Sequence, residues 1–177
     1  MSGVLLLYSL TLSRMVIGLV FSISGIGKLR DLSAFERAIV NFQILPKGLA
    51  RLSAYLFLMG ELAVVMLMLL GGWFLKPGFL LAFFLLIVFC TALLSVLIRG
   101  IQTPCNCFGV SQKPVSLYDI VRNVGFIGCA FVGWESLPIV PTTQASLVKL
   151  AFLGLMAIAF VTLWSRLGEV VELFRTS

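Results

Sequence analysis

The stretch TPCNCFGV places two cysteines one residue apart, at Cys105 and Cys107, in a polar segment of a mostly apolar chain. A disulfide can join residues this close only through a tight turn, because its Cα atoms lie roughly 4.4 to 6.8 Å apart. Asn106 tolerates the left-handed backbone that such a turn needs, and Gly109 frees the chain after it. Strained, exposed disulfides are typically the exchangeable ones. We therefore predict a redox-active cysteine pair.

Two other interpretations of the cysteine pair are a zinc site and a pair of inert thiols. The chain has four cysteines and no histidine, so it offers neither a histidine nor a second close cysteine pair to complete a zinc site. The lack of histidine also excludes Ser-His-Asp catalysis and His-ligated haem. We therefore expect no metal, and inert thiols remain the alternative to redox chemistry.

Charged residues accompany the expected redox loop, which runs over residues 99–116. Ser116 and Asp119 have the spacing of a capping pair, which would begin a helix at Leu117 and place its positive end beside the loop. Arg122 follows, and helix N-termini and nearby cations favour the reactive thiolate. We predict that Arg122 stabilises the thiolate. The alternative is that Arg122 pairs with Asp119 at i, i+3 spacing.

The composition is that of a membrane protein. The 177 residues are 60% hydrophobic and 11% charged, with a mean hydropathy of +1.13, whereas a water-soluble domain needs more charge on its surface. The net charge of +6 comes without a basic, aromatic-interleaved block, so we expect a lipid bilayer and no nucleic acid as partner.

The expected fold is an all-α transmembrane helical bundle, a single domain over residues 1–177, with a four-helix core, a fifth span and a short interfacial helix. The chain carries apolar stretches that suit five membrane spans. These spans are predicted at residues 4–27, 49–71, 77–98, 117–134 and 145–164.

The interfacial helix is predicted from Ala34 to Phe42. Ser33 and Glu36 have capping-box spacing at its start, and it must end before Pro46. Its apolar face is formed by Phe35, Ala38, Ile39 and Phe42. With five spans, this helix shares a side with the cysteine loop, so we expect it to cover the redox site.

Three charged residues lie within or at the end of the predicted spans. Arg14 and Glu61 are placed at similar depth on adjacent spans when counted from the first loop, so we predict an Arg14–Glu61 ion pair. That pair is either structural or part of a polar path. Lys28 is interpreted as a headgroup anchor or as a charge beside the redox loop.

The other two cysteines, Cys90 and Cys129, fall in the middle of predicted spans. Each lies about 15 Å from the loop at 1.5 Å per residue, too far for direct exchange. Gly125, Cys129 and Gly133 recur at every fourth residue, which is typical of closely packed helices. We expect packing roles for both cysteines.

Several stretches of the chain resemble the MauE family of methylamine-utilisation proteins, within the broader DoxX-like membrane proteins. These stretches are RMVIGLVFSISGIGKLRD, ILPKGLA, GELAVV, RGIQTPCNCFGV and PVSLYDIVRN. The most specific residues are a C-x-C-F-G stretch and a later Arg-Asn pair: Cys105, Cys107, Phe108, Gly109, Arg122 and Asn123. The family often has glycine where this chain has Asn106.

The resemblance implies a membrane partner of thioredoxin-fold proteins, needed when disulfide-containing enzymes mature outside the cytoplasm. Cys105 and Cys107 would be its exchanging pair. Analogy with helical-bundle oxidoreductases of the DsbB and vitamin K epoxide reductase types adds a membrane quinone as electron carrier, with either direction of electron flow. We therefore predict a thiol–disulfide oxidoreductase of the inner (cytoplasmic) membrane.

The distribution of basic residues conflicts with the expected orientation. Most basic residues of the loops and helix ends are predicted on the same side of the membrane as the cysteine loop. Lys76 and Lys149 are predicted on the other side. The positive-inside rule would then place the cysteines in the cytoplasm, where thiols stay reduced. The family role requires them outside, and we adopt the outward orientation.

Two other functions are open from the sequence. One is a small-solute or proton transporter in which Arg14 and Glu61 line a polar path. The other is a non-catalytic assembly scaffold for a redox partner. Replacement of both loop cysteines would leave either of these functions intact, whereas it would abolish thiol–disulfide exchange.

Overall fold

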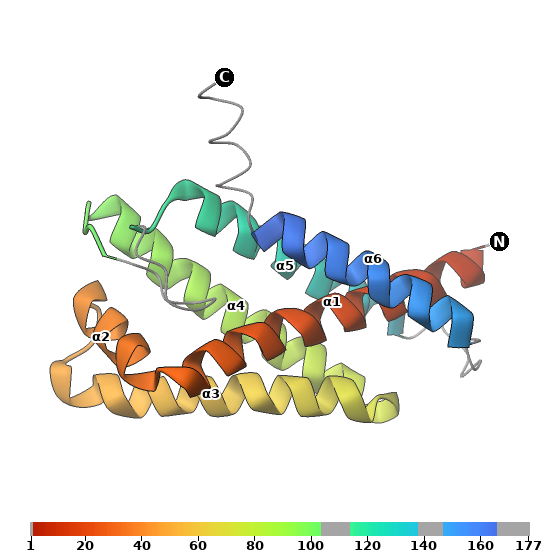
Figure 1. Cartoon of the computed structure of the whole chain (residues 1–177), viewed down its shortest axis with the longest axis horizontal. Coiled ribbons are helices and arrows are strands. Elements are labelled where there is room, and N and C mark those ends of the chain that lie inside the picture. The colour runs from red at the N-terminus through yellow and green to blue at the C-terminus, as the bar shows by residue number, and fades with distance from the viewer. Residues whose placement is uncertain (1, 104–113, 138–146, 166–177) are drawn as a thin grey trace, which may run out of the picture.

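The computed structural model describes residues 2–103, 114–137 and 147–165, and within them it is helical without strands (Figure 1). The elements are α1 (Ser2–Arg30), α2 (Leu32–Phe42), α3 (Lys47–Leu70), the short 3₁₀ helix η1 (Gly72–Phe74), α4 (Leu75–Ile98), α5 (Leu117–Ser136) and α6 (Leu147–Ser165). This confirms the all-α prediction. The five long helices begin and end near the limits of the five predicted spans.

Three of the described helical segments are long and apolar enough to cross a membrane: Leu6–Arg30, Gly48–Leu70 and Gly72–Ile98. A shorter apolar segment, Leu150–Ser165, lies in α6. Many large apolar side chains on these helices are exposed, such as Leu69 and Phe84, as expected for surfaces that face lipid. Five crossings remain a prediction, because neither α5 nor α6 is among the described segments that are long and apolar enough to cross.

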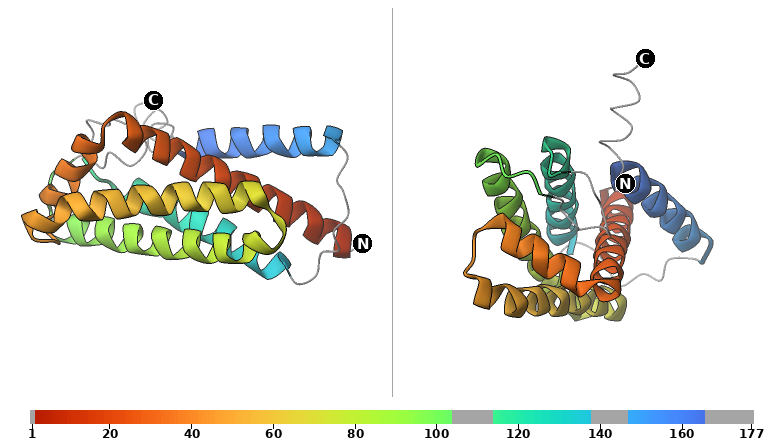
Figure 2. Two further views of the ribbon diagram at one scale, coloured as in Figure 1. Left: turned by 90° about the horizontal axis from the view of Figure 1, so that it is seen from below. Right: turned by 60° about the vertical axis from the view of Figure 1, so that its left-hand side comes forward.

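The core lies between four helices. In it α1 packs against α3 and α5, and α4 packs against the same two helices. The buried centre includes Ile17 of α1, Val64 of α3, Phe79 of α4 and Phe126 of α5. Helix α6 packs on the outside of α1 (Figure 2). This is the predicted four-helix core with an additional helix.

Glycines of α5 allow its neighbours to approach closely, as the small-residue spacing predicted. A Cβ at Gly133 would collide with the ring of Phe79 on α4, and a Cβ at Gly125 would collide with the indole of Trp164 on α6. Trp164 also donates a hydrogen bond from Nε1 to the backbone carbonyl of Arg122 (3.1 Å). Glycine is therefore required for packing on two sides of α5.

Helix α2 begins differently from the prediction. Its N-cap is Asp31, whose carboxylate accepts a hydrogen bond from the backbone N–H of Ala34 (2.8 Å), so the predicted Ser33–Glu36 capping box is wrong. Ser33 instead donates to Asp31 (2.7 Å). Both hydrogen bonds stabilise the ionised carboxylate and lower the pKa of Asp31, that from Ser33 most strongly. The predicted apolar face is confirmed: Phe35, Ala38, Ile39 and Phe42 are all buried.

Candidate functional site

The two described flanks of the cysteine loop lie side by side. The backbone N–H of Val115 donates a hydrogen bond to the carbonyl of Thr103 (3.0 Å), and both residues are buried. The loop residues that sequence reasoning selected lie outside the described residues: Cys105, Asn106, Cys107, Phe108 and Gly109. Their predicted roles therefore remain predictions, whereas the anchoring of the loop ends is part of the fold.

The N-terminus of α5 follows directly after this anchor. Ser116 and Asp119 form the predicted capping box, with the Ser116 backbone N–H donating to the Asp119 carboxylate (2.9 Å). The helix begins at Leu117, as expected. Its first-turn N–H groups provide partial positive charge at the point where the loop enters the helix.

Arg122 and Asn123 are the two buried polar residues of the first turns of α5. Arg122 forms the predicted ion pair with Asp119 at i, i+3 spacing (3.1 Å), and its role towards a thiolate remains a prediction. Asn123 is 1% exposed and donates from Nδ2 to the carbonyl of Asp119 (2.9 Å). Asp119 thus offsets part of the charge of Arg122.

Helix α2 packs next to the loop flanks. Ala38 and Phe42 share a buried cluster with Val96 of α4 and with Val115, the residue hydrogen-bonded to Thr103. Arg99 donates to the carbonyls of Phe42 and Gln43 at the end of α2 (3.1 and 3.2 Å). The expected proximity of α2 to both ends of the loop is therefore present, and Figure 1 shows α2 at the same end of the bundle as the α4 C-terminus.

The charged residue that Glu61 contacts is Lys28, so the predicted Arg14–Glu61 ion pair is wrong. Lys28 Nζ donates to Glu61 Oε1 (2.5 Å) and to Ser24 Oγ (2.7 Å), and Ser24 Oγ donates to the same carboxylate oxygen (2.9 Å). Lys28 is 2% exposed and Glu61 is 6% exposed. The headgroup-anchor interpretation of Lys28 is therefore also wrong.

Arg14 has a separate structural role. Its guanidinium donates to the carbonyls of Met68 (2.6 Å) and Leu69 (3.1 Å) at the end of α3. These carbonyls belong to the last turn of the helix, where no intrahelical donor follows. The chain then turns at Gly71, which has φ +71° and lies against the guanidinium. Arg14 thus caps α3 and is not the ion-pair partner of Glu61.

The physical reason for both corrections is the placement of α2. The predicted pair requires the end of α1 and the start of α3 to lie at the same depth, but the 11 residues of α2 lie between them and extend about 16 Å. Figure 1 shows the end of α1 beside the middle of α3. This offset brings Lys28, near the end of α1, to Glu61 near the middle of α3.

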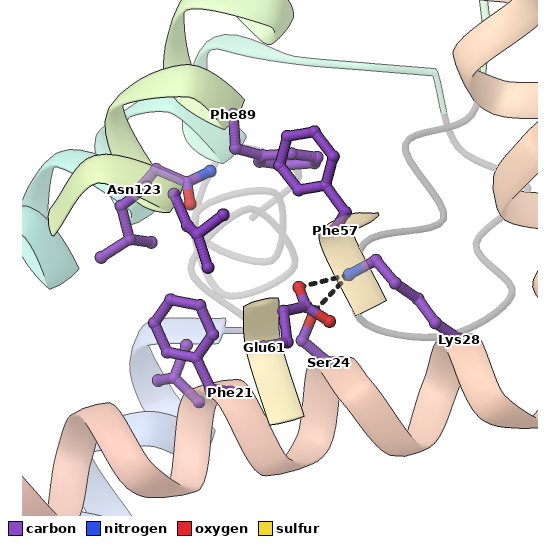
Figure 3. Close-up of a pocket in the computed structure, with 10 residues that line it drawn as sticks. Phe21, Ser24, Lys28, Phe57, Glu61, Phe89 and Asn123 are labelled. Carbon is purple, nitrogen blue, oxygen red and sulfur yellow. Dashed lines mark hydrogen bonds and ion pairs between the residues drawn. The ribbon is translucent and has the colours of Figure 1, made fainter. Parts of the chain in front are cut away.

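A small cavity of about 30 Å³ adjoins the Lys28–Glu61 pair (Figure 3). Its walls come from all four core helices, and its aromatic members are Phe21, Phe57 and Phe89. Asn123 of α5 lines it as well. The cavity thus connects the ion pair to one of the two buried polar residues that follow the cysteine loop.

Sequence reasoning selected Lys28 and Glu61 but did not join them, and it missed Ser24. The available signal was the i, i+4 spacing of Ser24 and Lys28, which places both on one face of α1. The two remaining cysteines are free thiols that are partly buried. Cys129 packs against the main core cluster, in agreement with its predicted packing role.

Comparison with known proteins identifies the family. A family model described as methylamine utilisation protein MauE matches residues 6–136, a region that contains most of α1, all of α2 to α5 and the cysteine loop. No curated protein and no solved structure matches the chain. The matched region is well over half of the sequence and includes three helices that are apolar enough to span a membrane. The chain is a membrane protein that belongs to the MauE family.

Proposed function

We propose that this protein is a membrane thiol–disulfide oxidoreductase in which Cys105 and Cys107 exchange a disulfide with a thioredoxin-fold partner. The observation that carries the proposal is the C-x-C pair in a loop whose two ends are hydrogen-bonded to each other at the N-terminus of α5. An anchored short loop favours the close approach of two cysteines, since a disulfide tolerates only a narrow range of Cα separations.

The electrostatics of the α5 N-terminus support a reactive thiolate. The helix dipole and the first-turn N–H groups favour an anion there by about 0.3–1 kcal/mol at an exposed site. Arg122 adds positive charge, but its ion pair with Asp119 reduces the contribution. We therefore assign the main support of the thiolate to the helix terminus and a secondary one to Arg122.

The exchange itself is balanced without a bound cofactor. In one direction a thiolate of the reduced partner attacks the Cys105–Cys107 disulfide, and the partner's second thiolate resolves the mixed disulfide, so that the partner becomes oxidised and the pair becomes a dithiol. Reoxidation of this dithiol to the disulfide releases two electrons and two protons, which is what reduction of a quinone to a quinol consumes. The exposed apolar helices would place the protein in the lipid phase where membrane quinones reside, so a quinone is the proposed electron carrier, in either direction.

We place the cysteine loop outside the cytoplasm of the cell membrane, because only an oxidising compartment keeps disulfides stable. The excess of basic residues at this end argues for the opposite orientation. Some of these basic residues make contacts within the fold, since Lys28 is buried in an ion pair and Arg99 binds the end of α2. These two residues therefore carry less topological weight than the sequence count assigns to them.

The first experiment is labelling of intact cells with a membrane-impermeant maleimide, before and after mild reduction. The protein carries Cys90→Ala and Cys129→Ala, so that only the loop cysteines react, and a Cys105→Ser/Cys107→Ser variant provides the blank. We expect the loop cysteines of intact cells to be labelled only after reduction. Labelling that requires cell lysis and no reductant would show a cytoplasmic dithiol and refute the proposed orientation.

The second experiment tests exchange directly. Single Cys105→Ser and Cys107→Ser variants should each leave one thiol, and the variant that retains the attacking cysteine should accumulate a mixed disulfide with a thioredoxin-fold protein. If neither variant traps a partner and the double variant still supports maturation of disulfide-containing enzymes, the exchange proposal is wrong and an assembly scaffold is the better interpretation.

A further inference from the structure

The two carboxylate oxygens of Glu61 have unequal surroundings. Oε1 accepts hydrogen bonds from Lys28 and Ser24. Oε2 is buried and has no hydrogen-bond partner among the residues that the structure describes. Buried polar atoms are nearly always hydrogen-bonded to protein or to ordered water. The second oxygen therefore calls for a donor that the described side chains do not supply.

The adjoining cavity has the size and the polarity for such a donor. Its volume of about 30 Å³ suits one or two water molecules, which need a polar lining as well as space. Glu61, Ser24 and Asn123 all line it. The rest of the wall is largely aromatic and aliphatic, as Figure 3 shows for Phe21, Phe57 and Phe89 around the polar group. Water is the ligand that fits this combination.

We propose that Ser24, Lys28 and Glu61 form a hydrated proton-binding site. Water in the cavity donates a hydrogen bond to Glu61 Oε2 and carries the proton to it. On protonation a hydronium ion gives its proton to the carboxylate, which yields a carboxylic acid and water and leaves the Lys28 ammonium unchanged. Inside the pair a proton can also pass from Lys28 Nζ to Glu61 Oε1, which yields a neutral amine and a neutral acid. No electron transfer is involved.

The described surroundings of the pair are uncharged. Helix α2 presents the ring of Phe35, whose centroid lies 4.6 Å from Lys28 Nζ. Helix α4 contributes Leu85 and Phe89 to the surroundings, and α5 contributes the uncharged Asn123. Among the described residues that line the cavity, Lys28 and Glu61 are the charged ones. Their protonation states therefore depend on each other, and they titrate as a unit.

The position of this site suits a protein that oxidises thiols, and this step rests on the proposed function. Phe89 lines the cavity and also packs against the buried cluster that contains Val115, the anchor of the cysteine loop. Helix α2 contacts both regions, through Phe35 at the ion pair and through Phe42 at the loop flank. We infer that the site takes up or releases protons when Cys105 and Cys107 change redox state.

The test is infrared difference spectroscopy of the full-length protein in lipid nanodiscs, as the pH is stepped down in H₂O and in D₂O. We expect a protonated-carboxyl band that grows as the pH falls and shifts in D₂O. Glu61→Gln should abolish this band, and Glu135→Gln, at an exposed position of α5, should leave it unchanged. Because Glu61→Gln leaves Lys28 buried without its counterion, the variant Lys28→Met/Glu61→Leu provides a second blank that keeps the site apolar.

The outcomes separate this inference from the proposed function. The hydrated proton site is refuted if the wild-type band persists in both Glu61→Gln and Lys28→Met/Glu61→Leu, if the wild type shows no such band, or if the band does not shift in D₂O. This holds even when the loop cysteines exchange disulfides. A Glu61 band that titrates in a protein with unreactive loop cysteines supports the site and refutes the exchange function. Coupling of the proton site to the loop cysteines is supported if the band changes when the wild-type loop is reduced and does not change in Cys105→Ser/Cys107→Ser. A wild-type band that is unchanged by reduction refutes the coupling.

Discussion

Replacing one member of the buried Lys28–Glu61 pair should destabilise the protein far more than replacing both. The side chains of Lys28 and Glu61 are 2% and 8% exposed, and their charged atoms are 2.5 Å apart. Loss of one member of a buried pair costs about 3–5 kcal/mol, because the other charge stays buried without compensation. Replacement of both members by apolar side chains of similar volume is often neutral or stabilising.

The expected loss of unfolding free energy in each single variant depends on the contacts that remain for the charged group left in the site. Lys28→Met should fall at the lower end, about 3 kcal/mol, because the Glu61 carboxylate retains Ser24 and can take up a proton to lose its charge. Glu61→Leu leaves the ammonium with Ser24 and the face of Phe35 and should cost about 4 kcal/mol. The double variant should lie within about 1 kcal/mol of the wild type, which gives a coupling energy of about 6–8 kcal/mol, well above the usual range of about 0.5–3 kcal/mol.

The assay is reversible denaturant unfolding of the four proteins in the same detergent micelle, followed by helical circular dichroism. Met66→Leu, at an exposed position of α3, is the control and should change the unfolding free energy by no more than about 0.5 kcal/mol. Additive single-variant effects, or a double variant as unstable as the worse single variant, would show that the pair does not form in the folded protein.

Three further predictions concern other contacts. Arg14→Met should lower the unfolding free energy by about 2 kcal/mol, since the carbonyls of Met68 and Leu69 lose a charged donor; the same unfolding assay measures it, and no change would refute the capping role. Gly133→Leu should lower the melting temperature in detergent, because the added side chain collides with the ring of Phe79; Gly128→Leu, where a Cβ meets nothing within 4 Å, is its control. The lowered pKa of Asp31 means that its contribution to stability is present above the unfolded value of about 3.9 and is lost as the pH falls through the folded value. The melting temperature of the wild type should therefore drop more steeply in acid than that of Asp31→Asn, which keeps a good N-cap without a titrating group; parallel curves would contradict this.

Much of the local structure follows from the sequence alone. Long apolar stretches separated by polar turns predict the long helices, and the apolar spacing from Phe35 to Phe42 predicts the buried face of α2. The Ser116–Asp119 pair predicts the start of α5 at Leu117. Each of these features depends on side chains within one or two helical turns, so local hydrogen bonding and hydrophobic periodicity suffice to predict them.

The partners of the intramembrane charges depend on how the helices are placed next to one another. The positions of Arg14 and Glu61 within apolar stretches indicate that both need polar partners, but the predicted Arg14–Glu61 pair is wrong. Helix α2 shifts the start of α3 along the bundle, so Glu61 lies beside Lys28, and Arg14 reaches the end of α3. Helix propensity and apolar periodicity are local properties, whereas the relative depth of two helices depends on how the connection between them folds and packs. The sequence by itself therefore determined which residues form helices and which of them required a polar partner, and the tertiary structure decided which partner each of them received.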